Sequence, residues 1–138
     1  MAALAAARAT KSRSLGRLVA YKMADSTTIY AGGMVMINSA GLATPAVAAA
    51  SNQGIVGVAT KTVTNASGGT ESILCQEGIF LFVATSIAQS AMGSKVYASD
   101  DQTVDETQGT NEPLAGVCAQ YVSSTSGWVD ISLANSKL

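Results

Sequence analysis

Short apolar runs separated by small and polar residues dominate the hydrophobic pattern of this chain. Met34 to Asn38 follows a glycine pair, and Ile55 to Thr64 is rich in β-branched residues. A further run covers Ser72 to Cys75. The apolar run Ile79 to Val83 is long enough for a buried strand and too short for a globular helix. The pattern predicts an all-β protein whose short strands are joined by turns.

The same pattern occurs twice. Residues 57–74 read GVATKTVTNASGGTESIL, and residues 116–133, 59 positions later, read GVCAQYVSSTSGWVDISL. Without a gap, Gly57 matches Gly116, Glu71 matches Asp130, and Leu74 matches Leu133. Residues 93–97 likewise repeat the Gly-x-x-Val pattern of residues 32–36, 61 positions later.

This repeat predicts how the chain forms a core. A single short meander cannot bury both of its faces, so one copy alone would be marginal. Two similar meander units, placed face to face or joined edge to edge, can share one core as a small β-barrel or sandwich. We therefore expect one compact domain built from two related halves.

Turn and loop signals complete the prediction. Ser67-Gly68 and Ser126-Gly127 each offer a glycine for the positive φ that a short hairpin loop requires. Trp128 follows the second of these glycines, where a tryptophan is more often a packing plug than a ligand platform. Residues 100–112 are acidic and amide-rich with almost no apolar residues, which indicates an exposed loop.

Charge is distributed unevenly along the chain. Residues 1–22 hold five cationic residues and no acid, whereas the rest of the chain holds three lysines and all nine acids. This asymmetry predicts an extended basic arm, residues 1–30, on an acidic body, residues 31–138. The arm residues expected to contact a partner are Arg8, Lys11, Arg13, Leu15, Arg17, Leu18, Val19, Tyr21 and Lys22.

Three interpretations of the arm remain open. Its alanine, serine and arginine content without acids is compatible with an organellar transit peptide. Its positive charge is compatible with a nucleic-acid-binding tail, although five charges spread along the segment are only a weak indication of nucleic-acid binding. A partner-binding arm that becomes ordered on docking is favoured, because Leu18 to Tyr21 can add a strand to a sheet edge.

Candidate chemistry is sparse. The chain has no histidine, so the commonest general base and metal ligand is missing. Cys75 and Cys118 are isolated, which favours two reduced, buried thiols, although a disulfide stays open. The triplet Asn65-Ala66-Ser67 matches a glycosylation acceptor, a pattern that arises readily by chance. No apolar run reaches membrane-spanning length. We expect no enzyme activity, no cofactor and no metal.

The ordered elements together resemble a known family. The stretches are AGGMVMINSAGLATPAVAAASNQGIVGVATKTV, ILCQEGIFLFVAT, MGSKVYAS and PLAGVCAQYVSSTSGWVDISL. Their shared elements are Gly32 to Val35, Pro45 to Ala50, Gly57 to Ala59, Gly78 to Phe80, Gly93 to Tyr97, Gly116-Val117 and Val129 to Leu133. In order and spacing, over about residues 30–134, they resemble the head decoration, or capsid cement, proteins of tailed phages.

The resemblance implies a small β-barrel or β-tulip body with an N-terminal arm. Such a protein is made in the host cytoplasm and sits on the outer surface of the virion capsid. There it bridges neighbouring major capsid protein subunits, as a homotrimer or, less often, a dimer. It implies no nucleic-acid partner, no membrane and no cofactor. The long, alanine-rich basic arm departs from the family pattern, so the resemblance assigns no contacts within it.

Two other classes of protein compete with this interpretation. A secreted or surface-layer β-protein would share the composition, but it should carry a cleavable signal, which is not recognisable here. A small β-domain that binds nucleic acid would use the basic arm, and its binding should fall steeply with salt.

Overall fold

The computed structural model describes residues 18–50 and 52–132, and nearly all its regular elements are β-strands. They are β1 (Leu18–Lys22), β2 (Thr27–Ile29), β3 (Met34–Asn38), β4 (Ala43–Pro45), β5 (Asn52–Ala59), β6 (Val63–Asn65), β7 (Ser72–Gln76), β8 (Gly78–Ala84), β9 (Lys95–Ala98), β10 (Thr103–Asp105), β11 (Leu114–Ser123) and β12 (Ser126–Ile131). A 3-10 turn, η2 (Gln89–Ala91), lies between β8 and β9. The predicted all-β fold is confirmed.

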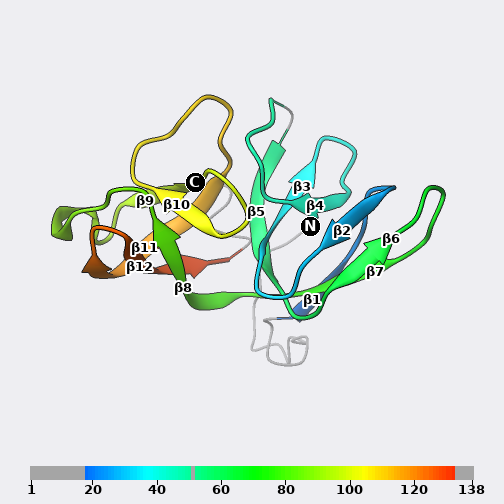
Figure 1. Cartoon of the computed structure of the whole chain (residues 1–138), viewed down its shortest axis with the longest axis horizontal. Helices are drawn as coiled ribbons and strands as arrows, with labels where there is room; N and C mark the ends of the chain where they lie inside the picture. Colours follow the sequence, from blue (N-terminus) through cyan, green and yellow to red (C-terminus); the bar gives the residue numbers. More distant parts are fainter. Residues whose placement is uncertain (1–17, 51, 133–138) are drawn as a thin grey trace, which may run out of the picture.

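The strands form two units that follow each other in the sequence. The first unit contains β1, β3, β4, β5 and β7, and the second contains β8 to β12. Figure 1 shows the units side by side, with the chain passing from β7 into β8 along the bottom of the molecule. A short ribbon of β2 and β6 is added to the first unit.

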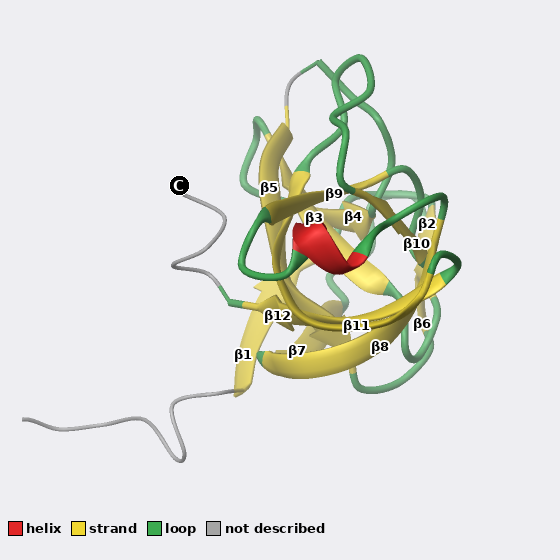
Figure 2. Cartoon of the chain, turned by 90° about the vertical axis from the view of Figure 1, so that its left-hand side faces the viewer, coloured by secondary structure: helices red, strands yellow, loops and turns green. Residues whose placement is uncertain are grey.

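The two units have the same strand order. The second unit is a closed barrel in the order β10-β8-β12-β11-β9. Parallel pairing of Val83 with Thr103 and of Ala84 with Val104 closes it. The first unit has the matching order β4, β1, β7, β5, β3, and a single parallel bridge between Met23 and Ala43 stands at the closing position. Figure 2 looks along the second unit, whose strands curve around η2.

The repeated Gly-Val pattern has a direct structural counterpart. Gly57 on β5 lies opposite Val35 on β3, and Gly116 on β11 lies opposite Val96 on β9. In each unit the register then shifts by one residue. The next partners are Met36 with Ile55 in the first unit and Tyr97 with Leu114 in the second. The predicted duplication therefore extends to the same β-bulge at the same place.

The gapless alignment of residues 57–74 with residues 116–133 is wrong for the last strand of each unit, β7 and β12. Val58 faces Gln76 on β7, and its counterpart Val117 faces Asp130 on β12. Gln76, and not Glu71, is thus the equivalent of Asp130, a shift of 54 positions in place of 59. The first unit has the longer connection because its loop includes β6, whereas β11 and β12 are joined by a tight hairpin. By the same register Leu74 corresponds to Trp128; Leu133 lies outside the described residues.

The body begins earlier than predicted. Residues 18–30 were expected in the arm, but they form β1 and β2, and Met23 and Ile29 are buried. β1 is the counterpart of β8. It brings the first unit close to a closed barrel, because the parallel bridge to β4 follows directly after it. Residues 1–17 lie outside the described residues.

Two strands, β3 and β5, lie between two hydrophobic clusters and contribute side chains to both. Along β3, Val35 and Ile37 belong to the cluster of the first unit, whereas Met34 and Met36 join the cluster of the second. β5 alternates in the same way, and all of its residues from Gly54 to Ala59 are buried. Strands buried on both faces explain the near-continuous apolar runs of this region.

Three local predictions have mixed outcomes. Gly68 has a φ of 71°, as a hairpin loop requires, but Gly127 lies inside β12 and is buried. Trp128 is not a packing plug, because its side chain points outward and is 36% exposed. The acidic stretch 100–112 is not entirely loop, since it contains β10 with buried Val104.

Candidate docking surface

β8 exposes a row of apolar side chains on the outside of the second unit. Ile79, Leu81 and Val83 alternate with inward-facing neighbours and are 56%, 51% and 52% exposed. The run does form a strand, as predicted, but it is not buried along its length, because only alternate residues enter the core. Trp128 on β12 lies directly opposite Leu81. These four residues are called the apolar strip below.

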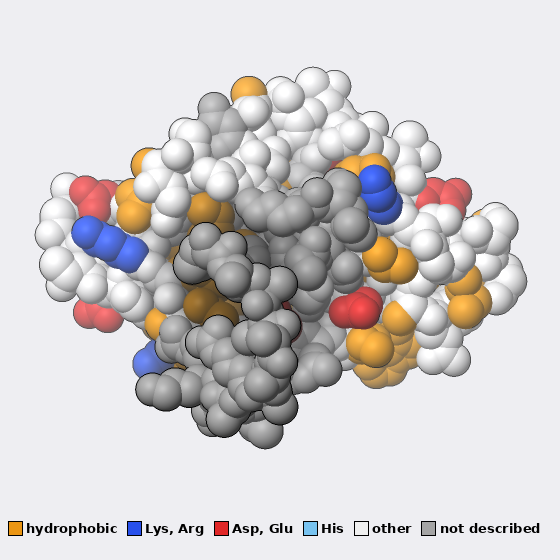
Figure 3. Space-filling view, turned by 180° about the vertical axis from the view of Figure 1, so that it is seen from behind, with side chains coloured by type: hydrophobic (Ala, Val, Ile, Leu, Met, Phe, Trp, Pro, Cys, Tyr) orange, Lys and Arg blue, Asp and Glu red, His pale blue; other side chains and the backbone are white. Residues whose placement is uncertain are grey.

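The duplicated fold provides an internal comparison for the strip. Its counterparts on the first unit are Leu18, Ala20 and Lys22 on β1, and Leu74 on β7. The first unit thus has a small and a charged residue where the second has leucine and valine. The fold does not itself require a strip this apolar. Figure 3, seen from behind, shows hydrophobic side chains at the surface of the second unit, on the right of that view.

Apolar area of this kind is typical of docking surfaces. Contiguous exposed patches of a few hundred Å² on soluble proteins are often sites of interaction. Tryptophan is also one of the residues that are enriched in the energetic centres of interfaces. The strip can bind a partner by desolvation, without covalent chemistry.

The predicted arm contacts are divided by the structure. Leu18, Val19, Tyr21 and Lys22 form β1, which pairs with β7 of the same chain. The expected strand addition at Leu18 to Tyr21 therefore takes place within the chain. The other predicted contact residues lie outside the described residues: Arg8, Lys11, Arg13, Leu15 and Arg17.

Tyr21 is partly buried at the margin of the core of the first unit. Its ring packs against the first cluster, and its hydroxyl is buried without a hydrogen-bond partner among the described residues. Burial raises the pKa of Tyr21, and the nearby Cys75 and Glu77 raise it further. Tyr21 as a whole is half-buried, and its buried hydroxyl is not presented to a partner.

The thiols are buried and unpaired, as the sequence predicted. Cys75 and Cys118 are free cysteines. Burial raises the pKa of Cys75 to about 12, and it also raises the pKa of Cys118. Because the thiolate is the reactive form, both thiols are poor nucleophiles near neutral pH.

Other candidate chemistry is also limited in the described part of the chain. Residues 18–50 and 52–132 contain no group of three or more side chains that could hold a metal ion. Asn65 is fully buried, so the folded protein does not present it as a glycosylation acceptor. No helix within these ranges has the length and apolar character to cross a membrane.

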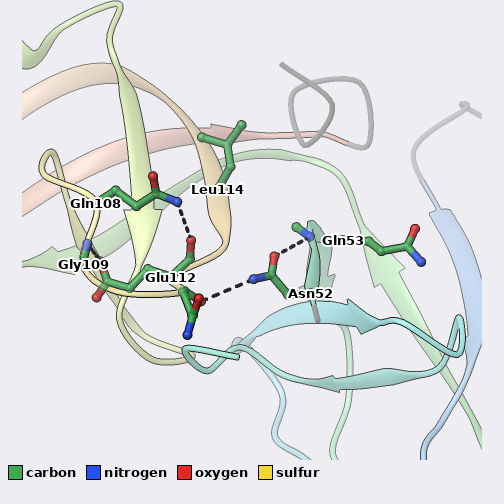
Figure 4. Close-up of a pocket in the computed structure, with 8 residues that line it drawn as sticks. Asn52, Gln53, Gln108, Gly109, Glu112 and Leu114 are labelled. Carbon is green, nitrogen blue, oxygen red and sulfur yellow. Dashed lines mark hydrogen bonds between the residues drawn. The ribbon is translucent and has the colours of Figure 1, made fainter. Parts of the chain in front are cut away.

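A polar cleft of about 620 Å³ lies where the two units meet (Figure 4). It is lined by Asn52, Gln53, Gly54, Gln108, Gly109, Asn111, Glu112 and Leu114. Its amides are engaged within the fold: Asn52 Nδ2 donates to the Asn111 carbonyl at 3.3 Å, and Gln108 Nε2 donates to the Glu112 carbonyl at 3.0 Å. The cleft has no aromatic side chain for stacking. The Asn52–Asn111 hydrogen bond connects the two units, whereas the Gln108–Glu112 bond lies within one loop of the second unit.

No protein-family model, curated protein or solved structure matches this chain.

Proposed function

We propose that this protein is a structural virion protein that binds the outer surface of a tailed-phage capsid and cements neighbouring major capsid subunits. The exposed apolar strip on the second unit is the observation that carries this proposal most directly. The proposal is also supported by the sequence elements that resemble the capsid cement family in their order and spacing. In this account the protein acts by binding, without catalysis.

The physical mechanism is selective binding to one state of the capsid. A protein that binds the mature lattice, and not its dissociated subunits, stabilises that lattice by mass action. Each copy that contacts more than one subunit adds avidity to the lattice as a whole. Burial of the strip supplies an apolar contribution of roughly 25 cal/mol per Å² of area removed from water.

Self-association belongs to the same proposal. We expect the protein to act as a homotrimer, with a dimer as the alternative, because a symmetric assembly multiplies its contacts with the shell. The remaining arm residues, 1–17, carry Arg8, Lys11, Arg13 and Arg17 and no acid. We propose that they contribute charge to the capsid contact.

Charge argues against the nucleic-acid alternative. The described residues contain nine acids and three lysines, Lys22, Lys61 and Lys95. An acidic body repels phosphate backbones, so the basic arm would have to bind against that field.

Co-sedimentation with phage heads tests the proposal. The purified protein is mixed with undecorated, emptied heads of the phage that encodes it, and separately with free DNA. We expect saturable binding to heads and none to DNA. Failure to bind heads in any maturation state, together with salt-sensitive DNA binding, would overturn the proposal in favour of a nucleic-acid-binding domain.

A further inference from the structure

The two hydrophobic clusters draw on the two units unequally. The buried members of the first cluster, from Met23 to Cys75, all belong to the first unit and its ribbon of β2 and β6. The second cluster combines residues of both units. Its buried members from the first unit are Met34, Met36, Ala46, Ile55 and Val58. The first unit therefore supplies its own core, whereas the core of the second unit is completed by side chains of the first.

At several equivalent inward positions the second unit has the smaller residue. The extra residue of the β-bulge is Val56 in the first unit and Ala115 in the second. The register of the last strands places Ile73 at the position of Gly127. A Cβ at Gly127 would lie 2.8 Å from Ile87 Cδ1, so this space is filled from the segment around η2. The strands of the second barrel thus leave part of its interior to side chains from outside those strands.

The first unit also has internal support that the second lacks. β2 pairs with β6, and Ile29 of β2 is buried in the first cluster. The fully buried Asn65 of β6 donates hydrogen bonds to the carbonyl oxygens of Met23 and Ala24. In the second unit the equivalent connection, between β11 and β12, is a tight hairpin. These contacts of the first unit involve no residue of the second, so they persist if the second unit opens.

The two units do not share a sheet. Among the described residues, no strand of the first unit pairs with a strand of the second. Across the contact, Met34 N donates to the Asp101 carbonyl at 2.8 Å, and Ala49 N donates to the Asn111 carbonyl at 2.9 Å. Both acceptors lie in loops of the second unit. The second unit can therefore open without breaking a strand ladder of the first.

We propose that the second unit opens as one cooperative piece while the first unit stays folded, and that the first unit does not open without the second. In the partly open form the first unit keeps its whole cluster. If the first unit opened, the second would lose the side chains that complete its core. A partner bound to the apolar strip, which lies on the unit that opens, would stabilise the closed form by mass action. The inference does not rest on the proposed capsid function.

Two equivalent amides report these openings in the unmodified, full-length protein. Ala59 N donates to the Gly33 carbonyl at 3.0 Å, and its counterpart Cys118 N donates to the Ser94 carbonyl at 2.9 Å. Both Ala59 and Cys118 are buried. Hydrogen exchange is followed by NMR at low urea concentrations and corrected for intrinsic exchange rates. We expect the Cys118 amide to exchange about tenfold or more faster than the Ala59 amide. Equal rates, or faster exchange at Ala59, would overturn the proposal.

A matched pair of substitutions shows which unit depends on the other. Val35 and Val96 occupy equivalent positions and are buried in the first and the second cluster, respectively. Val35→Ala destabilises the closed and the partly open form alike. It should therefore speed exchange at Ala59 by about fivefold or more and leave Cys118 unchanged. Val96→Ala destabilises only the closed form, so it should speed exchange at both amides by the same factor.

Every other pattern of exchange overturns the proposal. If each substitution speeds exchange only in its own unit, the two units open independently. If both substitutions speed exchange at both amides, the protein opens as a single cooperative piece. If Val35→Ala speeds both amides and Val96→Ala only Cys118, the dependence runs in the opposite direction. The comparison of the two amides in the unmodified protein needs no substitution, so it decides the proposal even where a variant fails to fold.

Discussion

Asn65 shows how one side chain holds together the part of the first unit that the second lacks. Its Nδ2 donates to the carbonyl oxygens of Met23 at 3.3 Å and Ala24 at 3.0 Å. Its Oδ1 accepts from Glu71 N at 3.1 Å. The fully buried amide therefore joins the segment after β1 to the loop between β6 and β7.

Replacing Asn65 by alanine should destabilise the fold strongly. Three backbone groups lose their partner, one in a buried and two in part-buried hydrogen bonds, which costs about 2–3 kcal/mol in the free energy of unfolding. Asn38→Ala is the matched control. Its Oδ1 also accepts two backbone bonds, from Ala40 and Leu42, but the residue is only half-buried and water can replace it. Urea denaturation measures both. Equal losses for the two variants would contradict the assigned role of Asn65.

At the scale of strands, Gly57 and Gly116 mark the same close approach in each unit. A Cβ at Gly57 would lie 3.0 Å from the Gln76 carbonyl oxygen on β7. A Cβ at Gly116 would overlap the Asp130 carbonyl oxygen on β12. The glycine of the repeated Gly-Val pattern is required because the neighbouring strand leaves no room for a side chain.

We predict that Gly116→Ala destabilises the protein more than Gly57→Ala does. Overpacking of this kind costs roughly 1–3 kcal/mol, and the closer overlap belongs to Gly116. Gly109→Ala serves as a control, because a Cβ there meets only the side chain of Glu112, which can move. Thermal and urea unfolding report the order. A Gly116→Ala protein as stable as the unmodified one would contradict the close approach.

The sequence predicted the equivalent strands correctly where both units have the same residues at the same positions. It failed where the two units share the arrangement of their strands but not the residues in them. The Gly-Val strands were found because a glycine is needed at the same bulge in both units. The last strands were misaligned because Ser67-Gly68 resembles Ser126-Gly127, although one pair lies in a loop and the other begins β12. β1 was assigned to the arm because Lys22 and the cations before it mask a strand whose counterpart, β8, is apolar.

At the scale of the whole molecule, the candidate surface depends on how the two units are joined. Both faces of β3 and β5 are buried because they separate the two clusters. The outer face of β8 has no such cover among the described residues. The sequence indicated the run Ile79 to Val83 but not its exposure, because an apolar run alone does not say which face is covered. That distinction needs the arrangement of the units.

Head binding by a pair of equivalent substitutions tests the central claim most directly. Leu81→Asp places a charge in the middle of the apolar strip, and Ala20→Asp places the same charge at the matching position of the first unit. Both residues are exposed, so both variants should remain folded. Occupancy of undecorated heads is then measured by sedimentation against protein concentration.

We predict that Leu81→Asp weakens binding to heads by about tenfold or more, since a charge in the centre of an apolar contact is costly. Ala20→Asp should bind as the unmodified protein does. Full binding by Leu81→Asp, or equal weakening by the two substitutions, would contradict the claim that the apolar strip of the second unit attaches this protein to the capsid.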